Sequence, residues 1–247
     1  MLTHLKQWGR IVKNILFPRF CITCHKRLLL NERYICTDCL WNLPLTHIHG
    51  EKGNIIERIT CDNVICTERA DSLFFYQAHT QYCQILFHFK YYNHPEVAVE
   101  MGKMMAQELQ GTDFFENIDC LLPIPLSQQR MKKRGFNQSE RLAHGISLVT
   151  GIPVDTTSVV RKVDNPSQTR LNVRERNENV SNIFELTNAD ALHGKHVLIV
   201  DDVITTGSTT RSCAHIAMQA GDVKVSFISL ATSKYNKKRT FASWQRP

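Results

Sequence analysis

The stretch VLIVDDVITTGSTT, residues 197–210, decides the fold that we expect for this chain. Its first four residues, Val197–Val200, are apolar, and a short continuous apolar run is typical of a strand buried on both faces of a sheet. Asp201 and Asp202 come directly after this run, and Thr205–Thr210 consists of five hydroxyl residues around one glycine. A helix is predicted over Ser208–Ala220. The stretch therefore predicts a buried strand, a polar loop and a helix, in that order.

The end of this strand and the start of this helix offer two kinds of ligand contact. In open α/β sheets, ligands bind just outside the carboxyl ends of the strands, where Asp201 and Asp202 are expected. A helix amino terminus is an anion site, and Gly207 lets a phosphate approach the backbone closely. A sugar phosphate would use both the carboxylates and the loop. The alternative is that both acids are solvated and Ser208 is an ordinary N-cap. A Walker A loop is excluded because no lysine follows the glycine.

Strands and helices alternate along the rest of the chain after Asp71, which predicts a parallel sheet with crossover helices. We therefore expect two parts, an amino-terminal module over residues 1–70 and an α/β domain over residues 71–247. The further strands are predicted over Leu73–Tyr76, Cys120–Pro125 and Lys224–Ala231, and the further helices over Pro95–Gln110 and Gln138–Thr150.

Two CxxC pairs lie in the amino-terminal part, CITC and CTDC, with eleven residues between them. Each pair on a tight turn directs two thiolates at one point, so two pairs supply a tetrahedral four-sulfur site that suits Zn²⁺. A site with four thiolates is closed, and we therefore expect a structural rather than a catalytic metal. A redox pair is the alternative. The predicted ligands are Cys21, Cys24, Cys36 and Cys39.

The total of nine cysteines favours a reducing compartment. An odd total without a signal peptide argues against a disulfide framework, so a cytoplasmic location is expected. Cys61 and Cys66 form a looser CxxxxC pair, which we interpret as structural thiols. Cys83, Cys120 and Cys213 are expected in the core.

Composition and charge restrict the class of protein further. The 247 residues are 43% apolar and 21% charged, which is typical of a globular protein, and no apolar run is long enough for a membrane span. The net charge of +7 suits phosphate-bearing partners, which include both nucleic acids and phosphorylated small molecules. Apolar residues at helical spacing among the first 16 residues indicate a basic helix, which either packs on its own protein or lies on a membrane or partner.

A second basic stretch, Arg130–Arg134, follows the predicted strand that ends in Pro125. Arg134 lies next to Gly135 and is the candidate for a phosphate contact, because guanidinium binds phosphate in bidentate geometry. Phe136 would either stack on a base or pack in the core.

The segment DDVITTGST, Asp201–Thr209, resembles the phosphoribosyl pyrophosphate (PRPP) motif of type I phosphoribosyltransferases. The chain as a whole is similar to the ComF family, which joins an amino-terminal four-cysteine zinc module to a phosphoribosyltransferase-like domain. The other segments that carry this resemblance are CITC…CTDC, Leu121–Ala143 with its RGFNQ core, Arg161–Phe184, and HFKYYNHPEVA around Lys90.

The resemblance implies a type I phosphoribosyltransferase-like parallel sheet flanked by helices, with a small four-cysteine zinc module. It implies that Asp201 and Asp202 hold the ribose and act in any catalysis, that Thr205–Thr209 hold the 5′-phosphate, and that Mg²⁺ accompanies PRPP. It also implies a role in DNA uptake and natural transformation, with single-stranded DNA and other DNA-uptake proteins at the inner membrane as partners. The expected PRPP-binding residues are Asp201, Asp202, Val203, Thr205, Thr206, Gly207, Ser208, Thr209, Arg134 and Lys90.

Two kinds of function remain open on these grounds. The chain is either an enzyme that displaces pyrophosphate from PRPP, or a competence factor that binds PRPP or single-stranded DNA without turnover. The PRPP motif indicates a ligand but not catalysis, and no residue of the sequence stands out as a general base for an acceptor.

Overall fold

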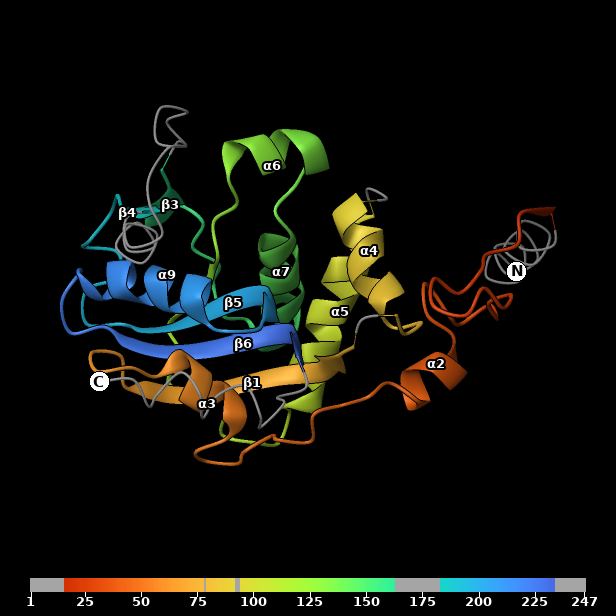
Figure 1. The fold of residues 1–247 in the computed structure, drawn as a ribbon, viewed down its shortest axis with the longest axis horizontal. Coiled ribbons are helices and arrows are strands. Elements are labelled where there is room, and N and C mark those ends of the chain that lie inside the picture. The colour runs from red at the N-terminus through yellow and green to blue at the C-terminus, as the bar shows by residue number, and fades with distance from the viewer. Residues whose placement is uncertain (1–15, 78, 92–93, 163–182, 234–247) are drawn as a thin grey trace, which may run out of the picture.

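The run Val197–Val200 lies in β5 (His196–Ile204), which is an inner strand of a four-stranded parallel sheet (Figure 1). This is a computed structural model, and it describes residues 16–77, 79–91, 94–162 and 183–233. The strand order is β1-β6-β5-β2, and every neighbouring pair is parallel. The other strands of the sheet are β1 (Thr67–Tyr76), β2 (Cys120–Pro123) and β6 (Lys224–Ser233). The predicted parallel sheet flanked by helices is confirmed.

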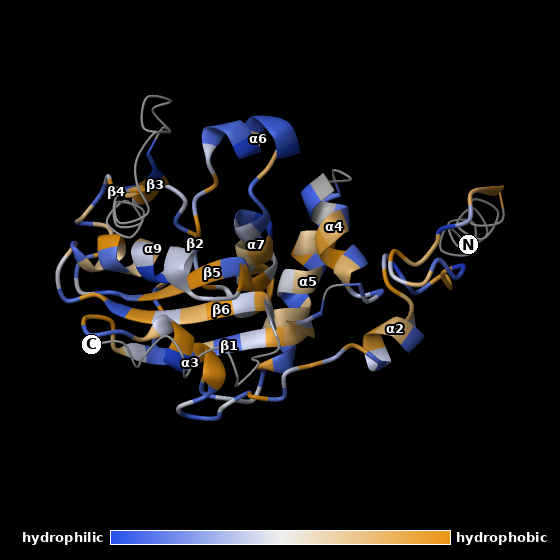
Figure 2. Ribbon diagram, viewed as in Figure 1, coloured by the Kyte–Doolittle hydropathy of each residue, from blue (hydrophilic) through white to orange (hydrophobic). Residues whose placement is uncertain are grey.

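Each face of the sheet is covered by its own set of helices. Alternate residues of β5 enter different cores, because side chains alternate across a strand: Leu198 packs in one core, and Val197 and Ile199 pack in the other. The first core lies under α4 (Cys83–Tyr91), α5 (Pro95–Glu108) and α7 (Gln138–Thr150), and the second lies under α3 (Ile55–Thr60) and α9 (Ser208–Met218) (Figure 1). Figure 2 shows apolar residues concentrated in β5 and β6, between the two helical layers.

The predicted elements differ from the observed ones mainly at their ends, but six elements of the described residues were not predicted, α3 and α4 among them. The helix Gln138–Thr150 is as predicted, and it ends at Gly151 with φ 76°. β5 extends four residues beyond Val200 and therefore contains both aspartates. β1 begins at Thr67 rather than Leu73. Propensity did not predict the short elements α2 (Thr37–Trp41), α6 (Gln128–Arg134), β3 (Val159–Arg161) and β4 (Phe184–Leu186).

The amino-terminal part is tied to the sheet along the outer edge of β1. The backbone N–H of Thr46 donates to Leu73, and the N–H of Phe75 donates to Pro44. Further along, α3 packs on β1 and its Ile56 is fully buried in the second core. The division into residues 1–70 and 71–247 stays a prediction.

Two predicted features lie outside the described residues. They are the amino-terminal basic helix and most of the segment Arg161–Phe184. Within the described part of the chain, none of the helices has both the length and the apolarity needed to span a bilayer.

Candidate functional site

The carboxyl end of β5 and the loop that leads from it to α9 contain the two acids and the hydroxyl residues predicted as the site. Gly207 is the N-cap of α9 and has φ 70°, a left-handed conformation that favours glycine. A small cavity of about 40 Å³ lies at this helix end, lined by Asp201, Val203 and the six residues from Thr205 to Thr210. Ser208 is the first residue of the helix rather than its N-cap, and the cap position carries no side-chain hydrogen bond. The first N–H groups of α9 therefore face a polar cavity, as an anion site requires.

The two carboxylates of the loop have different environments. The Asp201 side chain is only partly exposed, and its Oδ1 accepts hydrogen bonds from the N–H of Asp202 at 2.8 Å and the hydroxyl of Ser139 at 3.4 Å. Burial and the neighbouring charge of Asp202 raise the pKa of the Asp201 carboxyl to about 8. At neutral pH, Asp201 therefore favours its protonated form.

Asp202 is instead paired with a cation from the other side of the site. The Nζ of Lys90, on α4, lies 2.7 Å from Asp202 Oδ2, and both side chains are largely buried. The segment around Lys90 lies more than 100 residues before the loop in sequence, so the fold brings a predicted site lysine to a predicted site carboxylate. The expected contact of Lys90 with a ligand stays a prediction.

The segment from Arg134 to Ser139 lies next to the carboxyl groups, since Ser139 donates a hydrogen bond to Asp201. Arg134 ends α6 and donates to Oε1 of Gln138 at 2.9 Å. Gln138 is 2% exposed, and its Nε2 has no hydrogen-bond partner among the described residues. Asn137 caps α7 and donates through Nδ2 to the carbonyl of Ile124, just beyond β2, at 3.0 Å. Phe136 is buried in the first core, so of its two expected roles the structure supports packing.

Contacts with α3 also support the loop. A Cβ atom added at Gly207 would lie 2.6 Å from the carbonyl oxygen of Ile59, in α3. Arg211 of α9 donates to that same carbonyl and, at 3.0 Å, to the carbonyl of Thr206. Glycine at position 207 is thus required by packing against α3 as well as by its backbone conformation.

Sequence reasoning did not identify Ser139, Gln138 and Arg211 as site residues. Their positions depend on contacts between segments that are far apart in sequence, from Ile59 to Arg211 in one case and from Ser139 to Asp201 in another. The only available signal was that Gln138 is the last residue of the RGFNQ core and Ser139 follows it directly.

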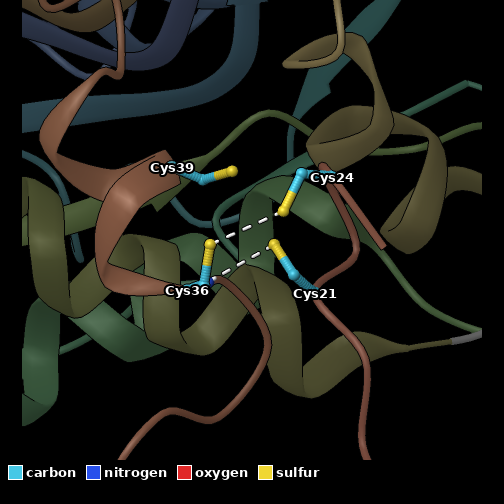
Figure 3. A group of neighbouring side chains, drawn as sticks. All are labelled: Cys21, Cys24, Cys36 and Cys39. Carbon is cyan, nitrogen blue, oxygen red and sulfur yellow. Dashed lines mark hydrogen bonds between the residues drawn. The ribbon is translucent and has the colours of Figure 1, made fainter. Parts of the chain in front are cut away.

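The four predicted metal ligands form one cluster (Figure 3). The Sγ atoms of Cys21, Cys24, Cys36 and Cys39 lie within 4.8 Å of one another, and the cluster is largely buried. Cys24 Sγ lies 3.6 Å from Cys36 Sγ, and the N–H of Cys36 donates to Cys21 Sγ at 3.3 Å. Such a group of sulfurs can hold a metal ion.

The electrostatics of the cluster also favour a cation. Burial opposes ionisation of Cys21, yet N–H groups of Cys24, Cys36 and Thr23 lower the pKa of its thiol to about 7. Burial raises the pKa of the Cys36 and Cys39 thiols. Ionisation of these two thiols would add more negative charge to the same apolar site. A bound divalent cation would compensate that charge and allow all four thiols to ionise.

The other cysteines divide by exposure. Cys83, Cys120 and Cys213 are buried, as predicted for core thiols. Cys61 and Cys66, which we expected to be structural thiols, are exposed.

Comparison with known proteins identifies relatives over most of the chain. The phosphoribosyl transferase domain family matches residues 90–243. The DNA utilization protein YhgH of Salmonella typhimurium is 30% identical over 224 residues, which cover 84% of this chain and 94% of that protein. YhgH of Escherichia coli (strain K12) is 28% identical over 210 residues, covering 83% and 86%. Competence protein F of Haemophilus influenzae is 24% identical over 220 residues, covering 85% and 96%.

Solved structures give weaker matches. Glutamine phosphoribosylpyrophosphate amidotransferase from B. subtilis, complexed with ADP and GMP, aligns with a TM-score of 0.40 and 22% identity. The alignment covers 57% of this chain, which spans only 30% of the amidotransferase chain. An adenine phosphoribosyltransferase aligns with a TM-score of 0.39 and 16% identity, covering 60% of this chain and 77% of the other.

Proposed function

This chain belongs to the ComF family of phosphoribosyl transferase domain proteins, and we propose that it binds PRPP together with Mg²⁺ at the β5–α9 loop. The observation that carries this proposal is that Asp201, followed directly by Asp202 in β5, lines the polar cavity at the α9 amino terminus. The ribose hydroxyls would bind Asp201 and Asp202, and the 5′-phosphate would accept hydrogen bonds from the N–H and hydroxyl groups of Thr205–Thr209.

The cations around the site would accommodate the pyrophosphate of PRPP. The Nζ of Lys90 lies 2.7 Å from Asp202 Oδ2. Ribose binding at Asp202 would therefore displace the Lys90 ammonium toward the pyrophosphate. Arg134 and the unpartnered Nε2 of Gln138 are further donors on the side of α7. Mg²⁺ would enter with PRPP and neutralise the pyrophosphate as it leaves.

Transfer of the phosphoribosyl group would require displacement of pyrophosphate at C1 of the ribose. The residues of this chain would contribute by positioning and electrostatics: Asp201 and Asp202 would hold the ribose, and the ionised carboxylate of Asp202 would stabilise positive charge that develops at C1. The alternative is binding without turnover. In either case we propose a cytoplasmic role in the handling of imported DNA, since the relatives include a competence protein and DNA utilization proteins.

Calorimetric titration of PRPP, with and without Mg²⁺, tests the ligand. Asp202→Asn should weaken PRPP binding about ten- to a hundredfold, because hydrogen bonds to charged groups contribute roughly 1.5–3 kcal/mol. Asp201→Asn replaces a protonated carboxyl and should weaken binding about two- to tenfold, because a neutral hydrogen bond contributes roughly 0.5–1.5 kcal/mol. Asp222→Asn, at an exposed position, is the matched control. If both site variants remain folded and bind like the wild type, the loop is not the PRPP site. Pyrophosphate release with candidate bases then separates catalysis from binding alone.

Gly207→Val, by contrast, is a poor test of phosphate binding. Even in the free protein, the added side chain would clash with Ile59. The variant would therefore also disturb the packing of α3 against α9.

We also propose that the four-cysteine cluster holds a structural Zn²⁺. Four thiolates within one buried group are the ligands of closed zinc sites. No open coordination position would remain for a substrate, so the metal would stabilise the amino-terminal part without taking part in chemistry.

Single-stranded DNA is a second candidate ligand, and the exposure of α6 favours it. None of the residues of α6 is buried, and Arg130, Lys132, Lys133 and Arg134 are present without any acidic residue. Figure 2 shows α6 as a hydrophilic helix that projects beyond the sheet. A phosphate backbone would bind such a helix by releasing counterions.

Binding of labelled oligothymidylate at several salt concentrations tests this surface. Lys132→Glu/Lys133→Glu should weaken binding and flatten its salt dependence. Lys52→Glu/Lys224→Glu changes the net charge equally at exposed positions elsewhere and should have a smaller effect. Equal losses in the two double variants would point to net charge rather than to α6.

A further inference from the structure

Cys61 and Cys66 differ from the other cysteines in being exposed. The four-cysteine cluster and the three core thiols account for the remaining seven, all of which lie in the described part of the chain. Neither the proposed PRPP site nor the proposed zinc site uses this pair. Exposed thiols are open to thiol–disulfide exchange, whereas buried ones are protected from it.

The chain reverses direction between the two cysteines. Asp62 donates its N–H to the carbonyl of Ile65 at 3.2 Å, and its Oδ1 accepts from the N–H groups of Val64 and Ile65 at 2.9 and 2.8 Å. Cys61 and Cys66 are the next residues outward on the two arms of this turn. A disulfide can join residues whose Cα atoms lie about 4.4–6.8 Å apart, a separation that the arms of a tight chain reversal can reach.

The Cys61 side chain also points across this turn. Its Sγ lies 3.1 Å from the carbonyl oxygen of Ile65, the residue bonded to Cys66. The sulfur is therefore directed at the opposite arm and not at solvent beyond α3.

We propose that Cys61 and Cys66 form a reversible disulfide by exchange with low-molecular-weight disulfides such as oxidised glutathione. One cysteine thiolate attacks the small disulfide, forming a mixed disulfide and releasing one small thiol. The second cysteine thiolate attacks the sulfur of the first, forms the Cys61–Cys66 bond and releases the second small thiol. Two protein thiols are oxidised, and one small disulfide is reduced to two thiols.

The position of this turn connects the disulfide with the loop at Gly207. Asp62, inside the ring that the disulfide closes, lies 2.8 Å from Nε2 of His215 and 3.9 Å from Nε of Arg211, both on α9. Ile59, two residues before Cys61, contacts the α9 amino terminus. The bond would thus fix a turn that pairs with α9 through Asp62 and that follows the α3 residue in contact with Gly207.

Mass spectrometry of the folded, full-length protein tests the proposal. The protein is equilibrated in glutathione buffers of increasing disulfide-to-thiol ratio, quenched with acid, and the free thiols are alkylated. Trypsin then releases ITCDNVICTER, residues Ile59–Arg69, which contains both cysteines and no other. The synthetic peptide of the same sequence, treated alike, is the reference for an unrestrained pair.

We expect the protein-derived peptide to pass from doubly alkylated to unalkylated and two hydrogen atoms lighter, at a ratio roughly tenfold lower than the free peptide requires. Cys66→Ser should abolish that species and leave Cys61 alkylated or joined to glutathione. The proposal is overturned if folded protein and free peptide oxidise at the same ratio, if two glutathione adducts accumulate, or if both thiols stay alkylated at every ratio.

Discussion

Asp201, Asp202 and Lys90 show how two neighbouring carboxyl groups can be compensated within one candidate site. Burial and the charge of Asp202 raise the pKa of Asp201 to about 8, so Asp201 retains its proton, and Lys90 neutralises Asp202 at 2.7 Å. Each acid is therefore compensated by a different means. A ligand with both hydroxyl groups and phosphates would redistribute these charges, with hydroxyls on the acids and phosphates on the cation.

Replacement of Lys90 tests this exchange. Lys90→Met should weaken PRPP binding about ten- to a hundredfold, because a charge-assisted contact with the pyrophosphate is lost. Ribose 5-phosphate, which lacks the pyrophosphate, should bind the variant at least as tightly as the wild type, since no ion pair with Asp202 must be broken. Calorimetry with both ligands is the measurement. Equal losses for the two ligands would show that Lys90 supports the loop rather than the pyrophosphate.

The protonation of Asp201 predicts how stability depends on pH. The pKa of this carboxyl is higher in the folded than in the unfolded chain, so the folded state binds more protons between about pH 4 and 8. This group should therefore lower the free energy of unfolding as the pH rises through that range. Asp201→Asn removes the effect, so its melting temperature should rise relative to the wild type as the pH increases.

Asp155→Asn provides a control of opposite sign for this measurement. Partial burial opposes the shift, yet hydrogen bonds from Ser158 and Thr157 hold the pKa of the Asp155 carboxyl below its usual value. That variant should lose stability relative to the wild type as the pH rises toward the unfolded pKa of about 3.9, and the difference should then stay constant between about pH 4 and 8. A constant difference between Asp201→Asn and the wild type across this pH range would contradict the assignment.

The helices α5 and α7 illustrate what the sequence predicts about a helix and what it does not. Helical periodicity predicted both helices, because the spacing of apolar residues reports which face is buried, and Val97 and Leu142 lie on those buried faces. It did not predict how closely the two helices pack. Gly102 and Gly145 face each other's backbones, and that proximity is a property of the pair that neither helix shows alone.

Gly145→Ala should destabilise the protein through this helix pair. The new Cβ would collide with the carbonyl oxygen of Val99 on α5, where only backbone movement could make room. Overpacking of this kind costs about 1–3 kcal/mol, which corresponds to a fall in melting temperature of about 2–12 °C for a chain of this size. Leu148→Ala, on the same helix at a position that is 57% exposed, should change the melting temperature little. A stable Gly145→Ala variant would show that the two helices can separate freely.

At the scale of the whole molecule, the amino-terminal part reaches the site loop as well as the sheet. Sequence patterns identified the four cysteines, the carboxylates and the loop, because each depends on residues close together in the chain. They could not identify the contact of Ile59 with Gly207 and Arg211, which joins positions about 150 residues apart. Arg33 of the cysteine-containing segment also pairs with Glu100 of α5 at 2.7 Å.

Loss of one ligand from the four-cysteine cluster should therefore destabilise the amino-terminal part first. Cys36→Ser leaves three thiolates, which cannot close a tetrahedral site, and the apolar residues of this segment then lack the metal that holds them together. The wild type should contain about one zinc per chain, and the variant should bind much less and be cleaved by protease within residues 16–46. Cys61→Ser, which removes an exposed thiol outside the cluster, should keep both the zinc and the protease resistance. Metal analysis combined with limited proteolysis decides the matter: a zinc-free wild type, or a Cys36→Ser protein as resistant as the wild type, would mean that the cluster does not support this part of the fold.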